Sequence, residues 1–280
     1  MNFRIMHGLC LLAVLSINMP AVIATPIEID VDTGLSSVTV QYCLGANCAN
    51  DSSPVIGLTV LKLDSIASPA QIQLHDFFFA LTEDIQLNLT GLSAVGAGMM
   101  FEYATPGVPT EPEPVGPGGG FSLFDVPANQ SGIVSYTATG TTCLLLTFAG
   151  YPCAGAIDLS QQGTQLGYFT GIVETLPGRV VRLTLHPEIS GPLDPANPAL
   201  GTVSITGTVV GMAAIPLRGD ANLDGAVDAA DIQPFVDTLL DPGAQSWQRR
   251  FAVDMDDDDT FDSFDAARLV DCLIEGQCGD

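Results

Sequence analysis

Two twelve-residue segments near the carboxyl end of the chain carry oxygen-bearing residues at alternate positions, which is the spacing of a calcium-binding loop. Positions 1, 3, 5, 9 and 12 offer side-chain oxygens, and position 7 offers a backbone carbonyl. The predicted ligand residues are Asp220, Asn222, Asp224, Ala226, Asp228 and Asp231 in the first segment, loop 1, and Asp254, Asp256, Asp258, Thr260, Asp262 and Asp265 in the second, loop 2. Hard oxygen ligands select Ca²⁺ over transition metals. The sequence therefore predicts a metal site in each loop, for two Ca²⁺ ions in all.

The two loops differ at position 6, where a calcium loop makes its sharpest turn. Gly225 supplies the positive φ there in loop 1, whereas loop 2 has Asp259. Aspartate tolerates the left-handed region better than most residues, so we expect a strained turn and less regular ion binding in loop 2. The alternative is that the run at 255–259 is only a solvated acidic stretch. Repetition of the pattern at equal phase favours ion binding.

Each loop is followed by apolar residues at helical spacing. These residues are Ile232, Phe235, Val236, Leu239 and Leu240 after loop 1 and Ala267, Val270 and Ile274 after loop 2. We expect two short helices that turn this face toward a small core, with Gly276 ending the second. The segment 203–216 is strand-like and then irregular, so the helix that precedes an ordinary EF-hand loop is not expected before loop 1.

The clustered carboxylates make folding of this region depend on the ion. Two unit charges ~4 Å apart repel by roughly 4 kcal/mol at an effective dielectric of 20. A core of this size supplies about 3 to 5 kcal/mol. We therefore expect residues 217–280 to be largely unfolded without Ca²⁺ and to fold as the ion binds.

The segments GDANLDGAVDAADIQPFVDTLL and VDMDDDDTFDSFDAARLVDCLI resemble the duplicated F-hand repeats of a type I dockerin domain, over about residues 218–276. In that family Asp replaces the EF-hand Glu at position 12, as Asp231 and Asp265 do here. The resemblance implies a small all-α domain that attaches, in a calcium-dependent way, to cohesin-like or other cell-surface protein modules. It also implies partner contacts at positions 10 and 11 of each loop, which are Ala229, Ala230, Ser263 and Phe264.

Before residue 217 the sequence predicts strands. Apolar and polar residues alternate at 85–89 and 181–186, and continuous apolar runs at 55–63, 77–81 and 144–148 fit strands in the middle of a core. About a dozen such segments, with no convincing amphipathic helix between them, favour a mainly β domain of the β-sandwich, jelly-roll-like kind. Prolines and glycines predict a long loop at 105–120.

Charge and targeting signals divide the chain of 280 residues. Residues 217–280 hold 16 of the 32 acidic residues, so we expect a signal peptide at 1–24, a β-sandwich domain at 25–216 and a dockerin-like domain at 217–280. Such a leader indicates a secreted protein, extracellular or at the cell surface. No later segment has ~20 consecutive apolar residues, so no membrane span is expected. A net charge of -24 with 8 basic residues excludes nucleic acid as a natural partner.

Six cysteines follow the leader in three short-range pairs, Cys43 with Cys48, Cys143 with Cys153 and Cys272 with Cys278. In an oxidising compartment we expect three local disulfides, although six cysteines allow 15 connectivities. Zinc binding is the competing interpretation. It is disfavoured because His75 and His186 both lie far from every cysteine pair in the sequence.

The β domain offers no assignable catalytic residue. The candidate carboxylates for a glycosidase are Glu83, Glu102, Glu174 and Glu188. This region has no tryptophan to stack on a sugar ring, which disfavours such an activity. No G-x-S-x-G motif accompanies the two histidines, which we expect on strand surfaces. Two functions stay open: a non-catalytic secreted protein that binds or builds an extracellular layer, or a small polysaccharide-degrading enzyme, a glycoside hydrolase or lyase. In either case the tail would attach the protein, and the β domain could contact polysaccharide.

Overall fold

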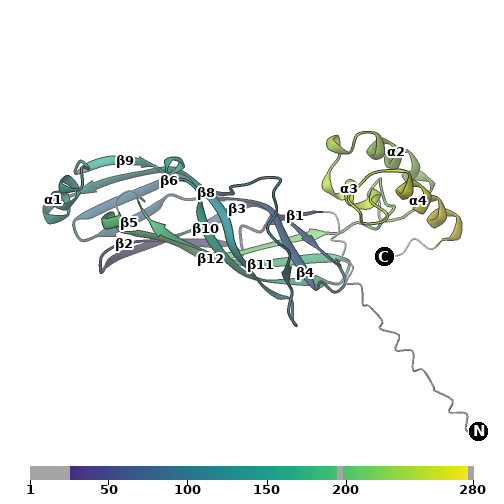
Figure 1. The fold of residues 1–280 in the computed structure, drawn as a ribbon, viewed down its shortest axis with the longest axis horizontal. Helices are drawn as coiled ribbons and strands as arrows, with labels where there is room; N and C mark the ends of the chain where they lie inside the picture. Colours follow the sequence, from purple (N-terminus) through teal and green to yellow (C-terminus); the bar gives the residue numbers. More distant parts are fainter. Residues whose placement is uncertain (1–25, 194–197, 277–280) are drawn as a thin grey trace, which may run out of the picture.

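The computed structural model describes residues 26–193 and 198–276. It contains an elongated β domain with a compact group of helices at one end (Figure 1). This arrangement confirms the predicted fold class, mainly β with a small helical region at the carboxyl end. The predicted signal peptide lies outside the described residues. Within the described ranges, no helix is long and apolar enough to cross a membrane.

All strands in the described residues precede α2, α3 and α4, and α1 lies between β8 and β9. The strands are β1 (Ile27–Val31), β2 (Ser37–Leu44), β3 (Asn47–Leu63), β4 (Gln71–Leu81), β5 (Ile85–Leu89), β6 (Leu92–Tyr103), β7 (Glu113–Pro114), β8 (Gly120–Ala138), β9 (Ala154–Asp158), β10 (Gln165–Leu176), β11 (Val180–Pro192) and β12 (Thr202–Ala214). The α-helices are α1 (Gly140–Phe148), α2 (Ile232–Leu240), α3 (Trp247–Val253) and α4 (Ser263–Glu275). Short 3₁₀ turns are η1 (Leu159–Gln161), η2 (Pro198–Leu200), η3 (Ala229–Asp231) and η4 (Pro242–Ala244).

The strands form one antiparallel sheet whose hydrogen-bonded ladder closes on itself. The order β1-β3-β4-β6-β8-β10-β11-β12 returns to β1, because β1 pairs with both β3 and β12. Both β1 and β2 lie between β3 and β12. β1 pairs with one stretch of each of these two strands, and β2 pairs with a different stretch of each. β5 and β9 extend β6 and β8 at the end that carries α1, far from α2, α3 and α4 (Figure 1). One continuous sheet therefore wraps around the apolar core.

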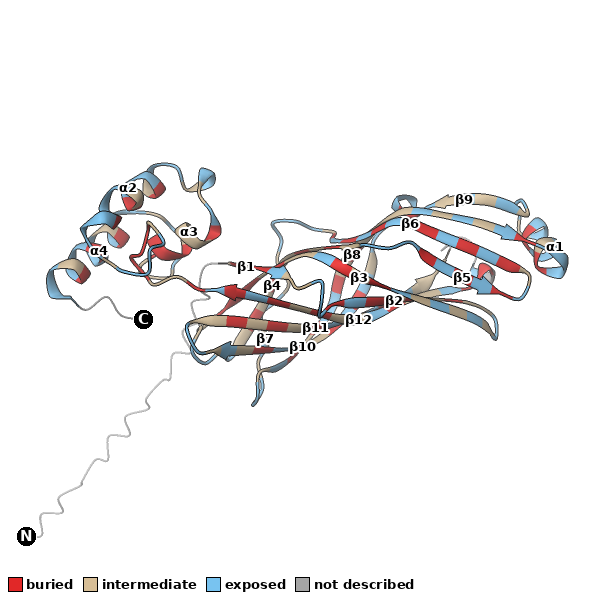
Figure 2. Ribbon diagram, turned by 180° about the vertical axis from the view of Figure 1, so that it is seen from behind, coloured by how far each residue is buried: buried red, intermediate tan, exposed pale blue. Residues whose placement is uncertain are grey.

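Period-two alternation places that core. Along β5 the residues are buried and exposed in strict alternation, as the sequence predicts, and the same banding runs along β6 and β11 (Figure 2). Aromatic rings fill the centre, where the Phe77 ring centroid lies 5.1 Å from that of Phe79 and 5.2 Å from that of Phe169. Both Phe77 and Phe169 are fully buried. Ring pairs at this separation add stabilisation beyond the area they bury.

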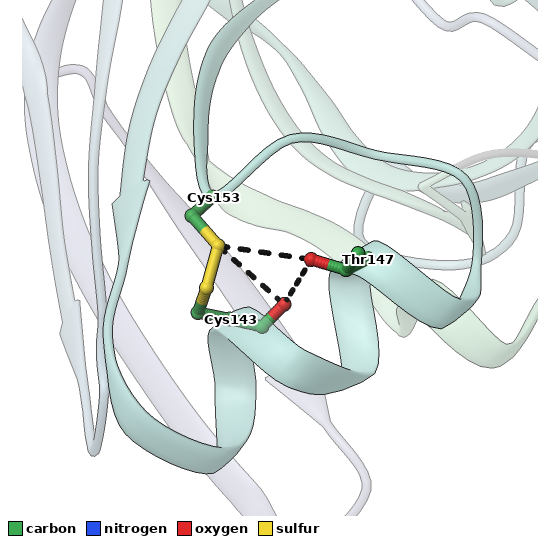
Figure 3. Close-up of a disulfide and its surroundings, with 3 residues drawn as sticks. All are labelled: Cys143, Thr147 and Cys153. Atoms are coloured by element: carbon green, nitrogen blue, oxygen red, sulfur yellow. Dashed lines mark hydrogen bonds between the residues drawn. A yellow bond between two sulfur atoms is a disulfide. The ribbon is translucent and has the colours of Figure 1, made fainter.

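The apolar run 144–148, predicted as a strand, is helical, so that prediction is wrong. It lies in α1, where Leu144, Leu145 and Phe148 are exposed. A disulfide between Cys143 and Cys153 joins the start of α1 to the following segment, and the Thr147 hydroxyl donates to the Cys143 carbonyl at 2.9 Å (Figure 3). Short apolar runs do not distinguish strand from helix by periodicity, and local closure by the disulfide favours the compact helix.

The other cysteine pairs divide between described and undescribed residues. Cys43 and Cys48 form a disulfide across the β2–β3 hairpin, as predicted, with their Cα atoms 4.1 Å apart. Both bridges of the β domain are therefore local. The predicted partner of Cys272, Cys278, lies outside the described residues.

The segment 105–120, predicted as a long loop, is tied to the sheet. Its Thr110 amide donates to the Leu74 carbonyl at 2.9 Å, and its Val115 amide donates to the Ala70 carbonyl at 2.8 Å. Between them β7 pairs with the start of β4. Proline removes a donor but keeps its carbonyl, so a Pro-rich segment can still line the edge of a sheet through the residues between its prolines.

Candidate calcium centre

Loop 1 is organised around its first and last carboxylates. Asp220 accepts hydrogen bonds from the amides of Asp224 at 3.0 Å and Gly225 at 2.9 Å. Asp231 accepts from the amides of Asn222 and Asp228, both at 2.9 Å. Asp220 and Asp231 are buried, at 3% and 0% exposure. These bonds curl the chain so that positions 1 and 12 face the same interior.

Loop 2 repeats the arrangement with its own residues. Asp254 accepts from the amides of Asp258 at 3.2 Å and Asp259 at 3.3 Å. Asp265 accepts from the amides of Met255 at 2.7 Å and Asp262 at 2.9 Å. Asp254 and Asp265 are buried in the same way as their counterparts in loop 1. The two loops thus share the bonds at position 1 and the bond from the position-9 amide to position 12. They differ in one bond, because position 12 also accepts from the position-3 amide in loop 1 and from the position-2 amide in loop 2.

Backbone dihedral angles show the same repeat. Position 4 is left-handed in both loops, with φ of 64° at Leu223 and 62° at Asp257. Position 6 is left-handed as well, with φ of 89° at Gly225 and 62° at Asp259. Asp259 therefore adopts the conformation that its place in the pattern predicts, at the cost of a non-glycine residue in a sparsely allowed region.

Loop 2 brings three carboxylates together. Asp254, Asp256 and Asp265 each offer an oxygen, and these atoms all lie within 4.8 Å of one another. Burial raises the pKa of Asp256 above its ordinary value, and the Asp258 charge adds to the effect. The pKa of Asp265 is also raised, again chiefly by burial. A cation bound beside these carboxylates would favour their charged forms.

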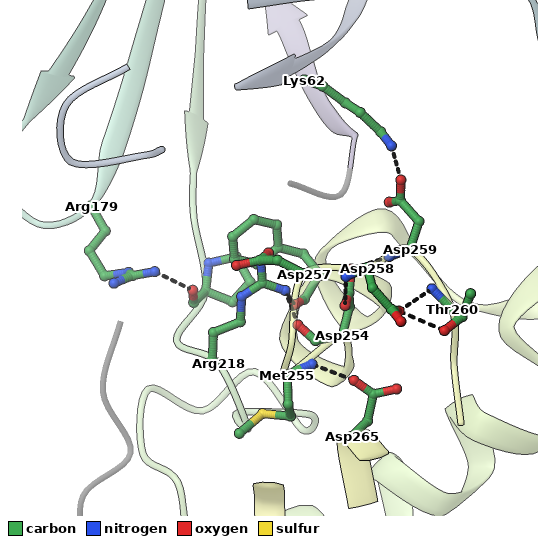
Figure 4. Close-up of polar contacts among 12 residues, drawn as sticks. Lys62, Arg179, Arg218, Asp254, Met255, Asp257, Asp258, Asp259, Thr260 and Asp265 are labelled. Carbon is green, nitrogen blue, oxygen red and sulfur yellow. Dashed lines mark hydrogen bonds and ion pairs between the residues drawn. The ribbon is translucent and has the colours of Figure 1, made fainter. Parts of the chain in front are cut away.

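A buried oxygen points to the same need. Oδ1 of Asp256 is buried and accepts no hydrogen bond from any described residue. Buried acceptors are almost always satisfied, so this atom requires a ligand. At the loop surface, Asp258 accepts from the Thr260 amide at 2.8 Å and the Thr260 hydroxyl, and these bonds lower the pKa of Asp258 (Figure 4). The oxygen donors fit Ca²⁺, which takes six to eight hard ligands.

The remaining predicted ligands lie along the same two loops. Asn222 donates to Asp224 at 3.0 Å, and Asp224 in turn accepts from the Ala226 amide at 3.0 Å. Asp228 and Asp262, at position 9, each accept from the amide two residues later at 2.7 Å and so begin the following helical turn. Position 9 therefore serves the loop and the helix at once.

Helices follow both loops, as predicted, but their buried faces differ from the prediction. On α2 Phe235 and Thr238 are buried, whereas Ile232, Val236 and Leu240 are exposed. On α4 the two repeat-equivalent positions, Leu269 and Cys272, are buried, and all three predicted residues, Ala267, Val270 and Ile274, are exposed. The buried face of each helix is set by the position-12 carboxylate, Asp231 or Asp265, because this group must face the loop interior. Residues four and seven positions later share its side of the helix and become the core.

The small core of this region lies between the two repeats. It consists of Ala221 in loop 1, Phe235 on α2, Val253 at the end of α3 and Leu269 on α4. The helix α3, which leads into loop 2, is not among the predicted elements. It begins after Ser246, whose hydroxyl accepts from the Arg249 amide at 3.4 Å. The serine three residues before a basic pair was the available signal.

The predicted partner-binding residues lie on the surface. Ala229 and Ala230 are exposed at the start of the turn before α2, and Ser263 and Phe264 are exposed at the start of α4. The Phe264 side chain is 68% exposed, which is unusual for an aromatic residue in a domain with so small a core.

Comparison with known families agrees with this geometry. Residues 218–273 match the type I dockerin domain. The match covers both loops, α2, α3 and nearly all of α4, and it leaves the β domain outside. No curated protein matches the chain. Dockerin domains bind calcium and attach to cohesin modules, so the dockerin region is a calcium-binding module for protein–protein attachment.

The carboxylates and histidines considered for catalysis are scattered over the β domain. Glu174 on β10 is paired with Arg182 on β11, and Glu102 and Glu188 are exposed on β6 and β11. His186 is exposed beside the Thr208 hydroxyl at 3.2 Å, as expected. His75 is half-buried on β4, and burial lowers its pKa to about 4. His75 is therefore less exposed than the strand-surface position predicted for it.

Proposed function

We propose that this protein is secreted and attaches, through its calcium-loaded dockerin domain, to a cohesin-type module, with the β domain as a non-catalytic binding or structural unit. In this proposal residues 25–216 form the β domain and 217–280 the attachment domain. One Ca²⁺ is held in each loop by the residues predicted from the sequence. The observation that carries the proposal is the repeat of hydrogen bonds and left-handed positions in the two loops.

When bound, each ion would neutralise the carboxylates that repel one another in its loop. The residues of each loop position the helix that follows it. Position-1 and position-12 carboxylates, held by backbone amides, fix the helices that follow them. Fixing α2 and α4 leaves apolar side chains on the outside at equivalent positions of both repeats, Val236 with Val270 and Leu240 with Ile274. With Phe264, these residues form the surface that we assign to the partner.

Calorimetry tests the calcium step. The chain from residue 26 onward is stripped with EGTA and titrated with Ca²⁺, and we expect two ions to bind per chain. Asp231→Asn and Asp265→Asn should each remove one ion's heat, because position 12 supplies a carboxylate that the amide cannot replace. Absence of stoichiometric heat in the unaltered chain would refute the calcium assignment.

Binding to immobilised type I cohesin modules tests the attachment step. We expect capture in Ca²⁺ that is lost in EGTA. Phe264→Ser should weaken capture without changing the calcium stoichiometry. Phe124→Ser, which alters a 60%-exposed phenylalanine of the β domain, is the matched control and should bind as the unaltered chain does. Equal capture in Ca²⁺ and EGTA would contradict the proposal.

A further inference from the structure

A lysine of the β domain is buried against loop 2. The side chain of Lys62, on β3, is 11% exposed, and its ammonium group forms an ion pair with Asp259 (Figure 4). Lysine is rarely buried without a partner, because desolvation of the ammonium is costly. Its partner belongs to the dockerin domain and occupies position 6 of the calcium loop. This is the position at which loop 2 lacks the usual glycine.

The first residues of the dockerin domain contribute a second cation to the same loop. Arg218 forms an ion pair with Asp257, at position 4, and donates to the carbonyls of Phe251 and Asp254 (Figure 4). Its guanidinium also lies 3.9 Å from the centre of the Phe251 ring. Positions 4 and 6 are not ligand positions, so both cations hold loop 2 from outside the ion site.

Apolar packing joins the domains beside these ion pairs. Trp247 and Phe251, on α3, are buried within the core cluster of the β domain, and α3 contacts β1. Arg250, on the same helix, lies 3.8 Å from Glu28 of β1. Arg179 of the β domain donates to the Pro216 carbonyl at 3.1 Å, which fixes the chain just before the dockerin domain begins. The helix that leads into loop 2 is therefore packed on the β domain.

Loop 2 must be folded for these contacts to form. Asp257 and Asp259 reach their partners from left-handed backbone positions that exist only in the closed loop. Folding of the loop depends on the ion, so docking depends on the ion too. Linkage is reciprocal, and docking must strengthen calcium binding by the same factor.

We propose that Lys62 makes the β domain part of the second calcium site, with Arg218 holding the same loop from within the dockerin domain, so that ion binding by loop 2 and docking of the two domains are one linked equilibrium. The proposal rests on the calcium-dependent function above and adds residues that set the affinity of one site. The consequence is a protein whose two domains are held in fixed relative orientation when calcium is bound and are released from each other when it is removed.

Trp247 gives a direct measurement, because it is the only tryptophan of the chain and lies between α3 and the β domain. The midpoint of its emission change is measured in calcium buffers on the chain from residue 26 onward. Lys62→Met should raise this midpoint by at least about fivefold, the lower end of usual coupling between sites. Loss of the lysine charge alone would act in the opposite direction, since a nearby cation repels Ca²⁺.

Two further variants separate coupling from general damage. In the Asp259→Asn background, Lys62→Met should not raise the midpoint further, because the ion pair is already absent. Arg182→Met, which removes a paired cation elsewhere on the β domain, is the matched control and should leave the midpoint unchanged. An unchanged or lowered midpoint in Lys62→Met overturns the proposal, as does a full effect in the Asp259→Asn background. Calcium binding by the unaltered chain, measured by calorimetry, shows separately whether the calcium step of the proposed function stands.

Discussion

Phe235→Ala is the most informative perturbation of the dockerin domain. Phe235 is 1% exposed on α2 and is the largest side chain in a core of only four buried residues. Truncating a buried phenylalanine costs about 3 to 5 kcal/mol, which equals the whole stability that so small a core supplies, about 3 to 5 kcal/mol. The variant should therefore fold only when calcium provides the missing free energy.

The size of the effect follows from linkage. Each bound ion stabilises the folded state by RT ln(1 + [Ca²⁺]/Kd), so two ions share the lost free energy between them. Restoring about 3 to 5 kcal/mol through two sites requires about 10- to 70-fold more free Ca²⁺. The midpoint of calcium-induced folding should rise by this factor.

Circular dichroism at helical wavelengths, measured on the chain from residue 26 onward in calcium buffers, gives that midpoint. Val236→Ala is the matched control, because this neighbour on α2 is 40% exposed and its truncation should move the midpoint less than threefold. A shift below threefold for Phe235→Ala, or equal shifts for the two variants, would show that folding of the domain does not depend on this core.

Three other predictions concern the β domain. Lowering the pH from about 6.5 to about 4 should destabilise the chain less in His75→Gln, measured by melting temperature, because His75 binds its proton at a lower pH when folded than when unfolded. Replacing Cys143 and Cys153 by serine opens a loop of sequence separation 10 and should cost about 2 to 3 kcal/mol in urea unfolding. Gly57→Ala, at φ 150° with its new Cβ 1.8 Å from a β4 carbonyl oxygen, should cost about 2 kcal/mol or more. Gly98→Ala, which has open space around it, should cost less. The first prediction is contradicted if the melting temperature of His75→Gln falls with pH as much as that of the unaltered chain. The second is contradicted if the urea midpoint does not change, and the third if the two glycine variants lose equal stability.

Some features of this protein are encoded locally and could be predicted from sequence. The calcium loops are such a feature, because all ligand positions fall within twelve consecutive residues and the backbone amides that orient them lie in the same segment. Alternation in β5 and the two short-range disulfides of the β domain are equally local. Each needs only neighbouring residues to be specified.

Tertiary structure decided what depends on distant contacts. The isolated apolar run 144–148 is ambiguous in sequence, and segment 105–120 pairs with β4 through Glu113 and Pro114, whose partners are Ile72 and Gln71. The faces of α2 and α4 were set by the inward carboxylates Asp231 and Asp265 rather than by hydrophobicity. Lys62 and Asp259 lie 197 residues apart, and no sequence pattern links them. Local spacing specifies which groups can bind an ion, whereas long-range packing alone determines which surface they are held against.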